Sequence, residues 1–185
     1  MSEIVFFLEE DSAKAMLEGL LPKIFPDDLV RRFIVFEGKQ DLEKQMVRRM
    51  KGYLVPDARF VVLRDQDSGD YQTVKDRLLE RCREANKKST LVCIACHELE
   101  SWYLADLAAV EHGLGVSNLA RLQEKNPYRA PDILPRPSER LAKIAPYQKL
   151  GGSRAIGPHL DPRNGRSRSF QNFVTGIQEL LSKEV

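Results

Sequence analysis

Phe60-Val61-Val62-Leu63-Arg64-Asp65-Gln66-Asp67 is the stretch that decides the fold. Its four consecutive apolar residues predict a strand that is buried on both faces, as in a parallel sheet. The two aspartates then lie at the carboxyl end of the strand, where open α/β sheets bind ligands. Because side chains two positions apart on an extended chain share a face, Asp65 and Asp67 can aim at one Mg²⁺ ion. The alternative is a solvated acidic turn, since Asp67-Ser68-Gly69-Asp70 is typical of turns and helix caps.

Three further apolar runs predict strands before and after this one. They are Ile4 to Leu8, Phe33 to Phe36 and Leu91 to Ala95. Segments with apolar residues at helical spacing separate them. Strand and helix alternate from residue 4 to about residue 110. This order predicts right-handed βαβ units and a four-stranded, mainly parallel sheet.

The pattern changes after the fourth strand. A helical run opens at His97, and its Trp102 and Tyr103 are expected to dock on the sheet. Short helices are expected over residues 117–125 and after Pro137, and the apolar stripe that starts at Phe170 predicts a long C-terminal helix. We therefore expect one domain over residues 1–185, with an α/β core over 1–110 and a helical, basic-loop elaboration over 111–185 packed on it.

Composition narrows the class of protein. With 42% apolar and 30% charged residues, the chain resembles an ordinary globular protein, and its net charge of +2 means that any basic surface must be local. No apolar run approaches the roughly 20 residues needed to cross a bilayer, and no export signal is apparent, so we expect no membrane association and a cytoplasmic location. The spacing of Cys93 and Cys96 matches CxxC, but within a strand and without a second pair it indicates buried thiols.

Acidic residues follow every predicted strand. A parallel sheet brings the carboxyl ends of its strands to one edge, where several carboxylates would repel and raise one another's pKa unless a cation lies among them. Divalent metal ions resolve this conflict, and pairs of them catalyse phosphoryl transfer. The pattern therefore predicts a Mg²⁺ or Mn²⁺ site built from some of Glu9, Glu10, Glu37, Asp65, Asp67, Glu98 and Glu100.

These residues also carry a resemblance to known families. Glu9 after the first strand and Asp65-Gln66-Asp67 after the third are similar to the Glu and Asp-Xaa-Asp signature of the TOPRIM fold, shared by topoisomerases, primases and OLD-family nucleases. Over nearly the whole chain, the sequence more closely resembles DUF4276, a TOPRIM-like bacterial family. This second resemblance implies a TOPRIM-like three-layer α/β fold, and it rests on the stretches Phe36 to Glu43, Leu63 to Asp70, Cys96 to Trp102 and Tyr147 to Lys149.

The TOPRIM resemblance implies a Mg²⁺-dependent nuclease that cleaves DNA or RNA, as in phage or plasmid defence. Glu9 would be the general acid or base, and Asp65 and Asp67 would hold the metal. A glutamate, Glu10, replaces the glycine that usually follows in TOPRIM proteins, which leaves open which of the two glutamates faces the site. Glu98 and Glu100 have the spacing to add a metal ligand, although acids are also favoured at a helix N-terminus by the helix dipole.

Basic residues must neutralise the substrate's phosphates near such a site. Residues 147–169 hold four glycines, five Lys or Arg and one acid, which predicts a basic, flexible loop. Lys149 is the candidate for stabilising transition-state charge, and Gly151-Gly152 would let backbone N–H groups approach an oxyanion. A surface loop with ordinary basic residues is the alternative. The candidate nucleic-acid contacts are Lys39, Arg154, His159, Arg163, Arg166 and Arg168.

Other functions fit parts of the pattern. A response-regulator receiver also places acids after its first and third strands, but it needs one phosphoacceptor where this chain has two aspartates. Phosphatases of the haloacid-dehalogenase type carry Asp-Xaa-Asp after the first strand, and the glycine fingerprint of dinucleotide binding is missing after Leu8. A non-catalytic subunit that binds nucleic acid or an ATPase partner is the main alternative, because related families are often encoded beside ATPases in phage-defence loci.

Overall fold

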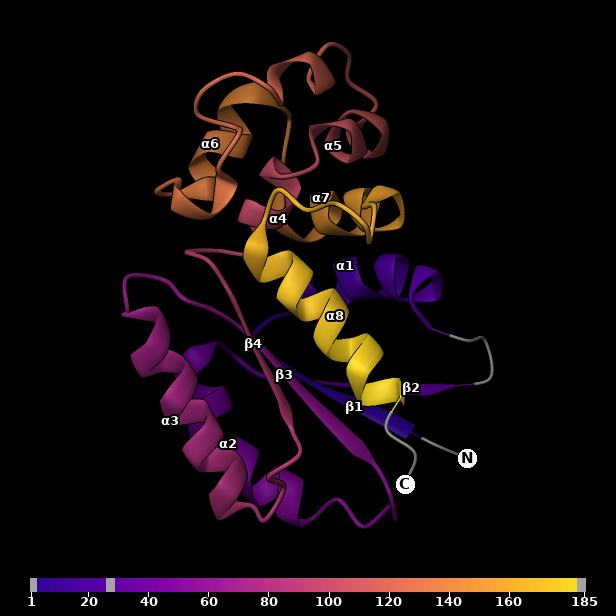
Figure 1. Ribbon diagram of the computed structural model, residues 1–185, viewed down its shortest axis with the longest axis vertical. Helices are drawn as coiled ribbons and strands as arrows, with labels where there is room; N and C mark the ends of the chain where they lie inside the picture. Colours follow the sequence, from indigo (N-terminus) through magenta and orange to yellow (C-terminus); the bar gives the residue numbers. More distant parts are fainter. Residues whose placement is uncertain (1–2, 26–28, 183–185) are drawn as a thin grey trace.

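A four-stranded parallel sheet forms the centre of the computed structural model, which describes residues 3–25 and 29–182 (Figure 1). Its strands lie in the order β2-β1-β3-β4 and pair in parallel throughout, so the predicted sheet is confirmed. The second strand begins and ends earlier than the Phe33 to Phe36 run had indicated. The strands are β1 (Glu3–Leu8), β2 (Val30–Val35), β3 (Arg59–Asp65) and β4 (Leu91–Ala95).

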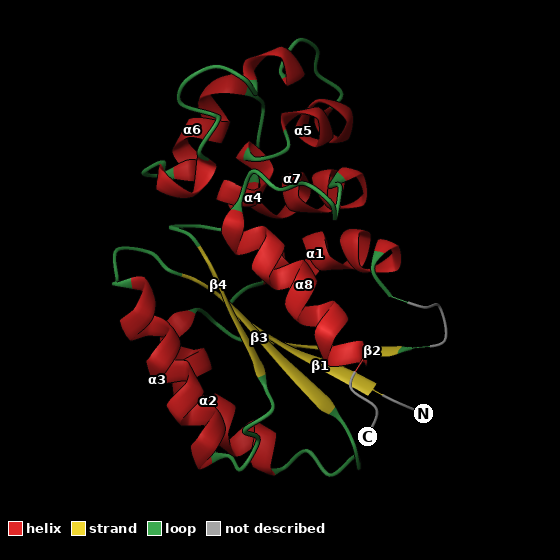
Figure 2. Ribbon diagram, in the orientation of Figure 1, coloured by secondary structure: helices red, strands yellow, loops and turns green. Residues whose placement is uncertain are grey.

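Helices cover both faces of this sheet and give the three layers that the sequence predicted (Figure 2). On one face lie α2 (Lys39–Lys51) and α3 (Tyr71–Glu84), and on the other lie α1 (Asp11–Leu20) and α8 (Arg168–Ser182). Alternate side chains of β3 enter the two separate hydrophobic clusters: Val61 packs on the α1/α8 side, and Val62 packs on the α2/α3 side. The continuous apolar run of β3 thus supplies both cores, as strands buried on both faces do.

The remaining helices gather beyond the carboxyl ends of the strands, as Figure 1 shows. Trp102 and Tyr103 are buried in the hydrophobic cluster that includes the α1/α8 face of the sheet, and their rings also contact side chains outside the sheet. The ring centroid of Trp102 lies 5.2 Å from that of Phe170 and 5.1 Å from that of Phe173, and Tyr103 lies 6.0 Å from Tyr147. These elements are α4 (Glu100–Leu104), α5 (Leu107–Leu114), α6 (Pro137–Ile144), α7 (Lys149–Ile156), and the 3₁₀ turns η2 (Ala120–Leu122), η3 (Pro131–Ile133) and η4 (Gly157–His159). A further 3₁₀ turn, η1 (Leu21–Lys23), directly follows α1.

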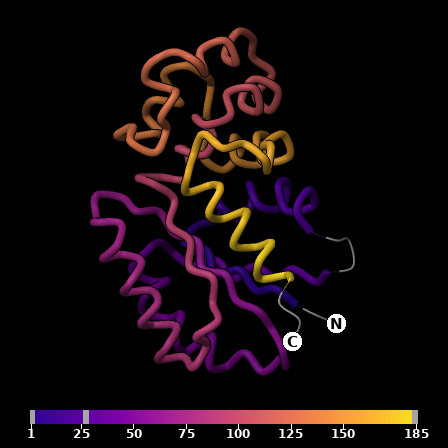
Figure 3. The backbone as a smooth tube through the Cα atoms, viewed as in Figure 1, coloured from indigo at the N-terminus to yellow at the C-terminus, as the bar shows by residue number. Residues whose placement is uncertain are grey.

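The predicted flexible loop over residues 147–169 is wrong. Helix α7 occupies its first part and lies beside α1 (Figure 3). The glycines allow close packing: a side chain at Gly152 would collide with the ring of Tyr147, and one at Gly157 would collide with the backbone of Met16. Since Gly152 donates its backbone N–H to Gln148 O within the helix, at 2.6 Å, the expectation that this group approaches an oxyanion is wrong as well.

The prediction of buried thiols within a strand is confirmed for Cys93 and wrong in part for Cys96. Cys82 and Cys93 are buried free thiols, and burial raises the pKa of Cys93 to about 12. Cys96, which follows β4, is only partly buried.

The segment expected to form a helix over residues 117–125 contains only the short turn η2.

Candidate active site at the carboxyl edge of the sheet

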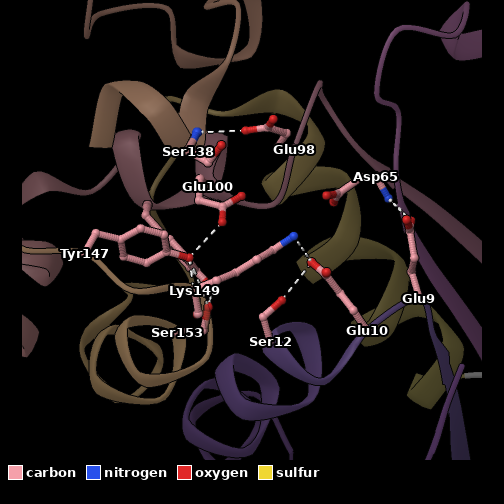
Figure 4. A network of polar contacts seen from close by, with 11 residues as sticks. Glu9, Glu10, Ser12, Asp65, Glu98, Glu100, Ser138, Tyr147, Lys149 and Ser153 are labelled. Carbon is pink, nitrogen blue, oxygen red and sulfur yellow. Dashed lines mark hydrogen bonds and ion pairs between the residues drawn. The ribbon is translucent and has the colours of Figure 1, made fainter. Parts of the chain in front are cut away.

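Acids that follow β1, β3 and β4 meet at one edge of the sheet, as the parallel topology predicted (Figure 4). Glu9 follows β1, and its Oε2 accepts a hydrogen bond from the backbone N–H of Asp65 at 3.1 Å. Asp65 is the last residue of β3, and Glu100 is the first residue of α4. With Glu10, these residues form what we call the carboxylate cluster: Glu9, Glu10, Asp65 and Glu100.

Lys149 is the cation of this cluster. Its Nζ lies 2.7 Å from Oε1 of Glu10, which also accepts a 2.8 Å hydrogen bond from Ser12 Oγ. Burial lowers the pKa of Lys149, but the hydrogen bond to Glu10 and the charges of neighbouring carboxylates outweigh burial and raise it. Lys149 therefore stays protonated. Both glutamates after β1 face this edge, since Glu9 contacts β3 while Glu10 contacts α7.

Glu100 is the most deeply buried carboxylate of the cluster, with 1% of its surface exposed. Its Oε1 accepts a 2.8 Å hydrogen bond from the hydroxyl of Tyr147, which also lies 3.3 Å from Ser153 Oγ. Its Oε2 is buried and has no hydrogen-bond partner within residues 3–25 and 29–182. Burial raises the pKa of Glu100, although the hydrogen bond from Tyr147 opposes the shift.

The cluster holds more negative charge than one lysine neutralises. Burial raises the pKa of Asp65 well above its usual value, and the charges of Glu9 and Glu100 raise it further. Burial also raises the pKa of Glu9, against the hydrogen bond from the Asp65 backbone. These shifts mean that the carboxylates compete for protons unless a further cation joins them.

Asp67 and Glu98 lie beside the cluster, with other partners. The strand ends at Asp65, and Asp67 has a left-handed backbone with φ of 55°, so the expected alternation of side chains does not reach it. Asp67 is paired with Lys39 at 2.7 Å, and Glu98 Oε2 accepts a 2.7 Å hydrogen bond from the backbone N–H of Ser138. Both acids line a pocket of about 440 Å³, which we call the rim pocket.

Among the predicted nucleic-acid contacts, Lys39 is the one that pairs with an acid at this edge in the described part of the chain. Arg163 pairs with Asp161 at 3.2 Å, and Arg166 pairs with Glu124 at 2.7 Å. His159 stacks against His112, with 5.9 Å between ring centroids. Arg154 and Arg168 are exposed.

Sequence reasoning did not assign a role to Tyr147 or Ser153. In the sequence, Tyr147 stands out only as part of the stretch Tyr147 to Lys149 that resembles DUF4276. Its aromatic ring and its hydroxyl do different work here, since the ring packs on Gly152 and the hydroxyl donates to Glu100. The order Tyr147-Gln148-Lys149-Leu150-Gly151-Gly152 was the available signal, but a glycine pair is more often typical of a loop.

The residues of the cluster fit a hard divalent cation by their chemistry. All four offer oxygen donors, which Mg²⁺ and Mn²⁺ prefer, and the unpartnered Oε2 of Glu100 is a free ligand atom beside Asp65. As they stand, however, no three His, Cys, Asp or Glu side chains in the described residues are arranged to hold a metal ion. Lys149 supplies the positive charge in the present arrangement.

Comparison with known families identifies the chain. The model of the domain of unknown function DUF4276 matches residues 8–178. The chain belongs to the DUF4276 family. Its fold is similar to a solved structure of the C-terminal region of the Burkholderia pseudomallei OLD protein, with a TM-score of 0.52 and 17% identity over 97% of this chain and 98% of that one.

The structural likeness confirms the TOPRIM-like α/β architecture expected from the sequence. A search of curated proteins gives no match for this DUF4276 member. Among its described residues, none of the helices has both the length and the hydrophobicity required to cross a bilayer.

Proposed function

We propose that this protein is a nuclease that uses Mg²⁺ or Mn²⁺ to cleave phosphodiester bonds of DNA or RNA. The observation that carries the proposal is the carboxylate cluster, in which acids after β1, at the end of β3 and at the start of α4 gather with one lysine, which pairs with Glu10. Such an excess of carboxylates destabilises the fold, because each raises the pKa of its neighbours. A site of this kind becomes stable and useful when a divalent cation binds to it.

The proposed metal ligands are Asp65 and Glu100, helped by one glutamate from the pair after β1. Asp65 is fixed by the end of β3, and Glu100 is held by Tyr147 while its second oxygen stays unpartnered. A bound ion would stabilise charge on the phosphate oxygens and lower the pKa of a metal-bound water. Asp67 and Glu98, which share the rim pocket, would hold a second ion or its water ligands.

Glu9 is the proposed general acid or base. Its pKa is raised by burial, which brings it closer to the range in which a carboxyl group exchanges a proton during a reaction. Lys149 is the proposed donor to the developing charge, because its Nζ faces the cluster and stays protonated. In the ground state Glu10 holds this ammonium in place.

Nucleic acid is therefore the proposed partner. We further propose that the protein acts with an ATPase in phage or plasmid defence. The likeness to the OLD region supports the fold on which it rests. The rival proposal, a subunit that binds nucleic acid without cleaving it, shares the fold and differs only in whether the cluster performs chemistry.

Nicking of supercoiled plasmid and cleavage of a labelled RNA by the purified protein test the proposal, each with Mg²⁺, with Mn²⁺ and with a chelator. We expect metal-dependent cleavage that is lost in Asp65→Asn and Glu9→Gln. Glu37→Gln is the matched control, because Glu37 is an exposed acid after β2. Cleavage that persists in Asp65→Asn would point to a contaminating nuclease, and binding without cleavage would favour the non-catalytic subunit.

A further inference from the structure

A second, basic pocket lies on the opposite side of β3 from the carboxylate cluster. Its volume is about 480 Å³, and we call it the α2/α3 pocket after the two helices that supply most of its residues. Five of these residues are cationic and only one is acidic. The lining residues are Lys39, Gln40, Glu43, Lys44, Arg64, Arg77 and Arg81.

Ion pairs do not neutralise this pocket. Glu43 pairs with both Arg64 and Arg77, the latter at 3.5 Å. Lys39 pairs with Asp67 outside the pocket, and Arg81 pairs with Glu84 at 3.1 Å. Even with these two outside acids included, five cations face three carboxylates. The pocket therefore retains a positive potential that attracts anions.

Arg64 forms the buried floor of this pocket. It is 5% exposed, and it extends from β3 toward the α2/α3 side as the strand's pleat requires. One terminal nitrogen of its guanidinium donates to Glu43. Its Nε is buried and has no hydrogen-bond partner in residues 3–25 and 29–182. A buried N–H donor costs free energy when it is unpaired, so this group is suited to an anionic ligand.

The α2/α3 pocket adjoins the rim pocket, which lies beside the candidate active site. Lys39 lines both this pocket and the rim pocket, where Asp67 and Glu98 lie. Arg64, on the floor of the α2/α3 pocket, directly precedes Asp65 of the carboxylate cluster in the sequence. Lys39 is therefore the residue through which a ligand in the rim pocket would reach the α2/α3 pocket.

We infer that the α2/α3 pocket binds the phosphodiester backbone of the nucleic acid whose cleavage is proposed above. Arginine guanidinium groups match the geometry of phosphate oxygens, and lysines add non-directional charge. Among the described residues that line the pocket, none is an aromatic on which a base would stack. The ligand contact is therefore to phosphates and does not depend on base sequence. The identity of the ligand rests on the proposed nuclease function, while the site itself stands on its charge and on Arg64.

Binding without cleavage tests this inference. The fluorescence anisotropy of short labelled single-stranded DNA and of the matching RNA is measured in a chelator, so that no reaction occurs. The test variant replaces Lys44, Arg77 and Arg81 with Gln, and leaves the buried Arg64 intact. The control variant replaces Arg49, Lys51 and Arg83 with Gln. These three residues are exposed on the same two helices and do not line the pocket, so both variants lose the same net charge.

We expect the test variant to bind about 100-fold more weakly than the parent protein near 0.1 M salt, and the slope of log K against log salt to fall in magnitude by about 2, as for three lost phosphate contacts. The control variant should keep most of the affinity and the slope. Thermal melting verifies that both variants fold. Equal losses in the two variants, or no loss in either, would overturn the inference.

Two further results separate this inference from the proposed function. If the parent protein never cleaves nucleic acid but the test variant alone loses binding, the pocket is confirmed and the nuclease proposal fails. If Asp65→Asn abolishes cleavage while the test variant binds and cleaves normally, the nuclease proposal stands and the pocket inference fails. Inorganic phosphate and a free nucleoside triphosphate are added as competitors of the labelled strands. If the three substitutions weaken competition by these small ligands but leave the binding of the strands unchanged, the assignment to a nucleic-acid backbone is overturned.

Discussion

Arg64 and Asp65 are neighbours on β3, yet they belong to opposite electrostatic environments. Asp65 lies among three other carboxylates with one lysine, whereas Arg64 lies among four other cations with one glutamate. The pleat of the strand separates them, because successive side chains point to opposite faces of a sheet. Each face of the sheet thus collects an excess of charge of one sign near the same edge.

The difference between these regions fits the two ligands proposed above. Like charges that are held together destabilise a protein, and here both signs are concentrated instead of being interleaved. A divalent cation on one side and a polyanion on the other would relieve both concentrations at once. Substitutions on the two sides should therefore change the stability of the protein in opposite directions.

The largest effect is expected on cleavage. Asp65→Asn should lower the rate of metal-dependent plasmid nicking by at least about 100-fold, comparable with the loss of a group that stabilises the transition state. It should not lower stability, because it removes one of several repelling carboxylates. Rates measured with a labelled plasmid, together with the melting temperature, verify both points. A variant that is inactive and also much less stable would indicate a structural role for Asp65.

Substitution of the neighbouring residue, Arg64, should lower stability, in contrast to Asp65→Asn. Arg64→Met leaves Glu43 with only the longer contact to Arg77, and breaking a largely buried ion pair costs about 3 kcal/mol in the free energy of unfolding. Urea denaturation of Arg64→Met and Asp65→Asn measures the contrast directly. Arg77→Met, whose exposed side chain makes the longer contact to the same Glu43, is the control and should cost much less. Equal costs at positions 64 and 65 would remove the distinction between the two sides.

The pH dependence of stability should come from the cluster. The folded-state pKa values of Glu9, Asp65 and Glu100 lie above their ordinary values near 4, so the folded protein binds more protons than the unfolded chain. Stability should therefore fall as pH rises from the ordinary values through the raised ones, by up to about 1.4 kcal/mol per pH unit for each group. Mn²⁺ should restore stability above this window.

Melting curves at several pH values, with and without Mn²⁺, measure this effect. Asp65→Asn should flatten the profile and weaken the response to Mn²⁺, whereas Glu37→Gln should leave both unchanged. A pH profile that is the same in Asp65→Asn as in the parent protein would show that the cluster does not titrate as a unit.

The smallest effect is expected at Tyr147. Tyr147→Phe keeps the ring packed against Gly152 but removes the donor to Glu100, which should cost about 1 to 2 kcal/mol and raise the pKa of Glu100 further. Cleavage should fall modestly, and its pH profile should shift upward. A variant with reduced stability but an unshifted profile would show that the hydroxyl supports the fold without tuning Glu100.

Much of the fold was predictable because local patterns and topology agree. The apolar runs predicted four strands, the helical spacing predicted α2 and α8, and their alternation predicted a parallel sheet. The gathering of Glu9, Asp65 and Glu100 followed from that topology alone. Helix α7 was missed because glycines are typical of loops, whereas here Gly152 makes room for the ring of Tyr147, and Gly157, just after the helix, packs on the backbone of Met16. The expected common face of Asp65 and Asp67 failed because the strand ends between them.

The sequence by itself determined that acids would collect at one sheet edge, since the order of strands and helices dictates where parallel strands end. Only the tertiary structure decided that Lys149 pairs with these acids and that Asp67 and Glu98 have other partners. Lys149 reaches Glu10 because α7 packs on α1, and Asp67 turns to Lys39 because its backbone leaves the extended conformation. Likewise, Arg64 at the end of an apolar run gives no sign of a basic pocket until α2 and α3 bring their charges beside it. Periodicity records which face a residue occupies, whereas the partners on that face come from segments that only folding brings together.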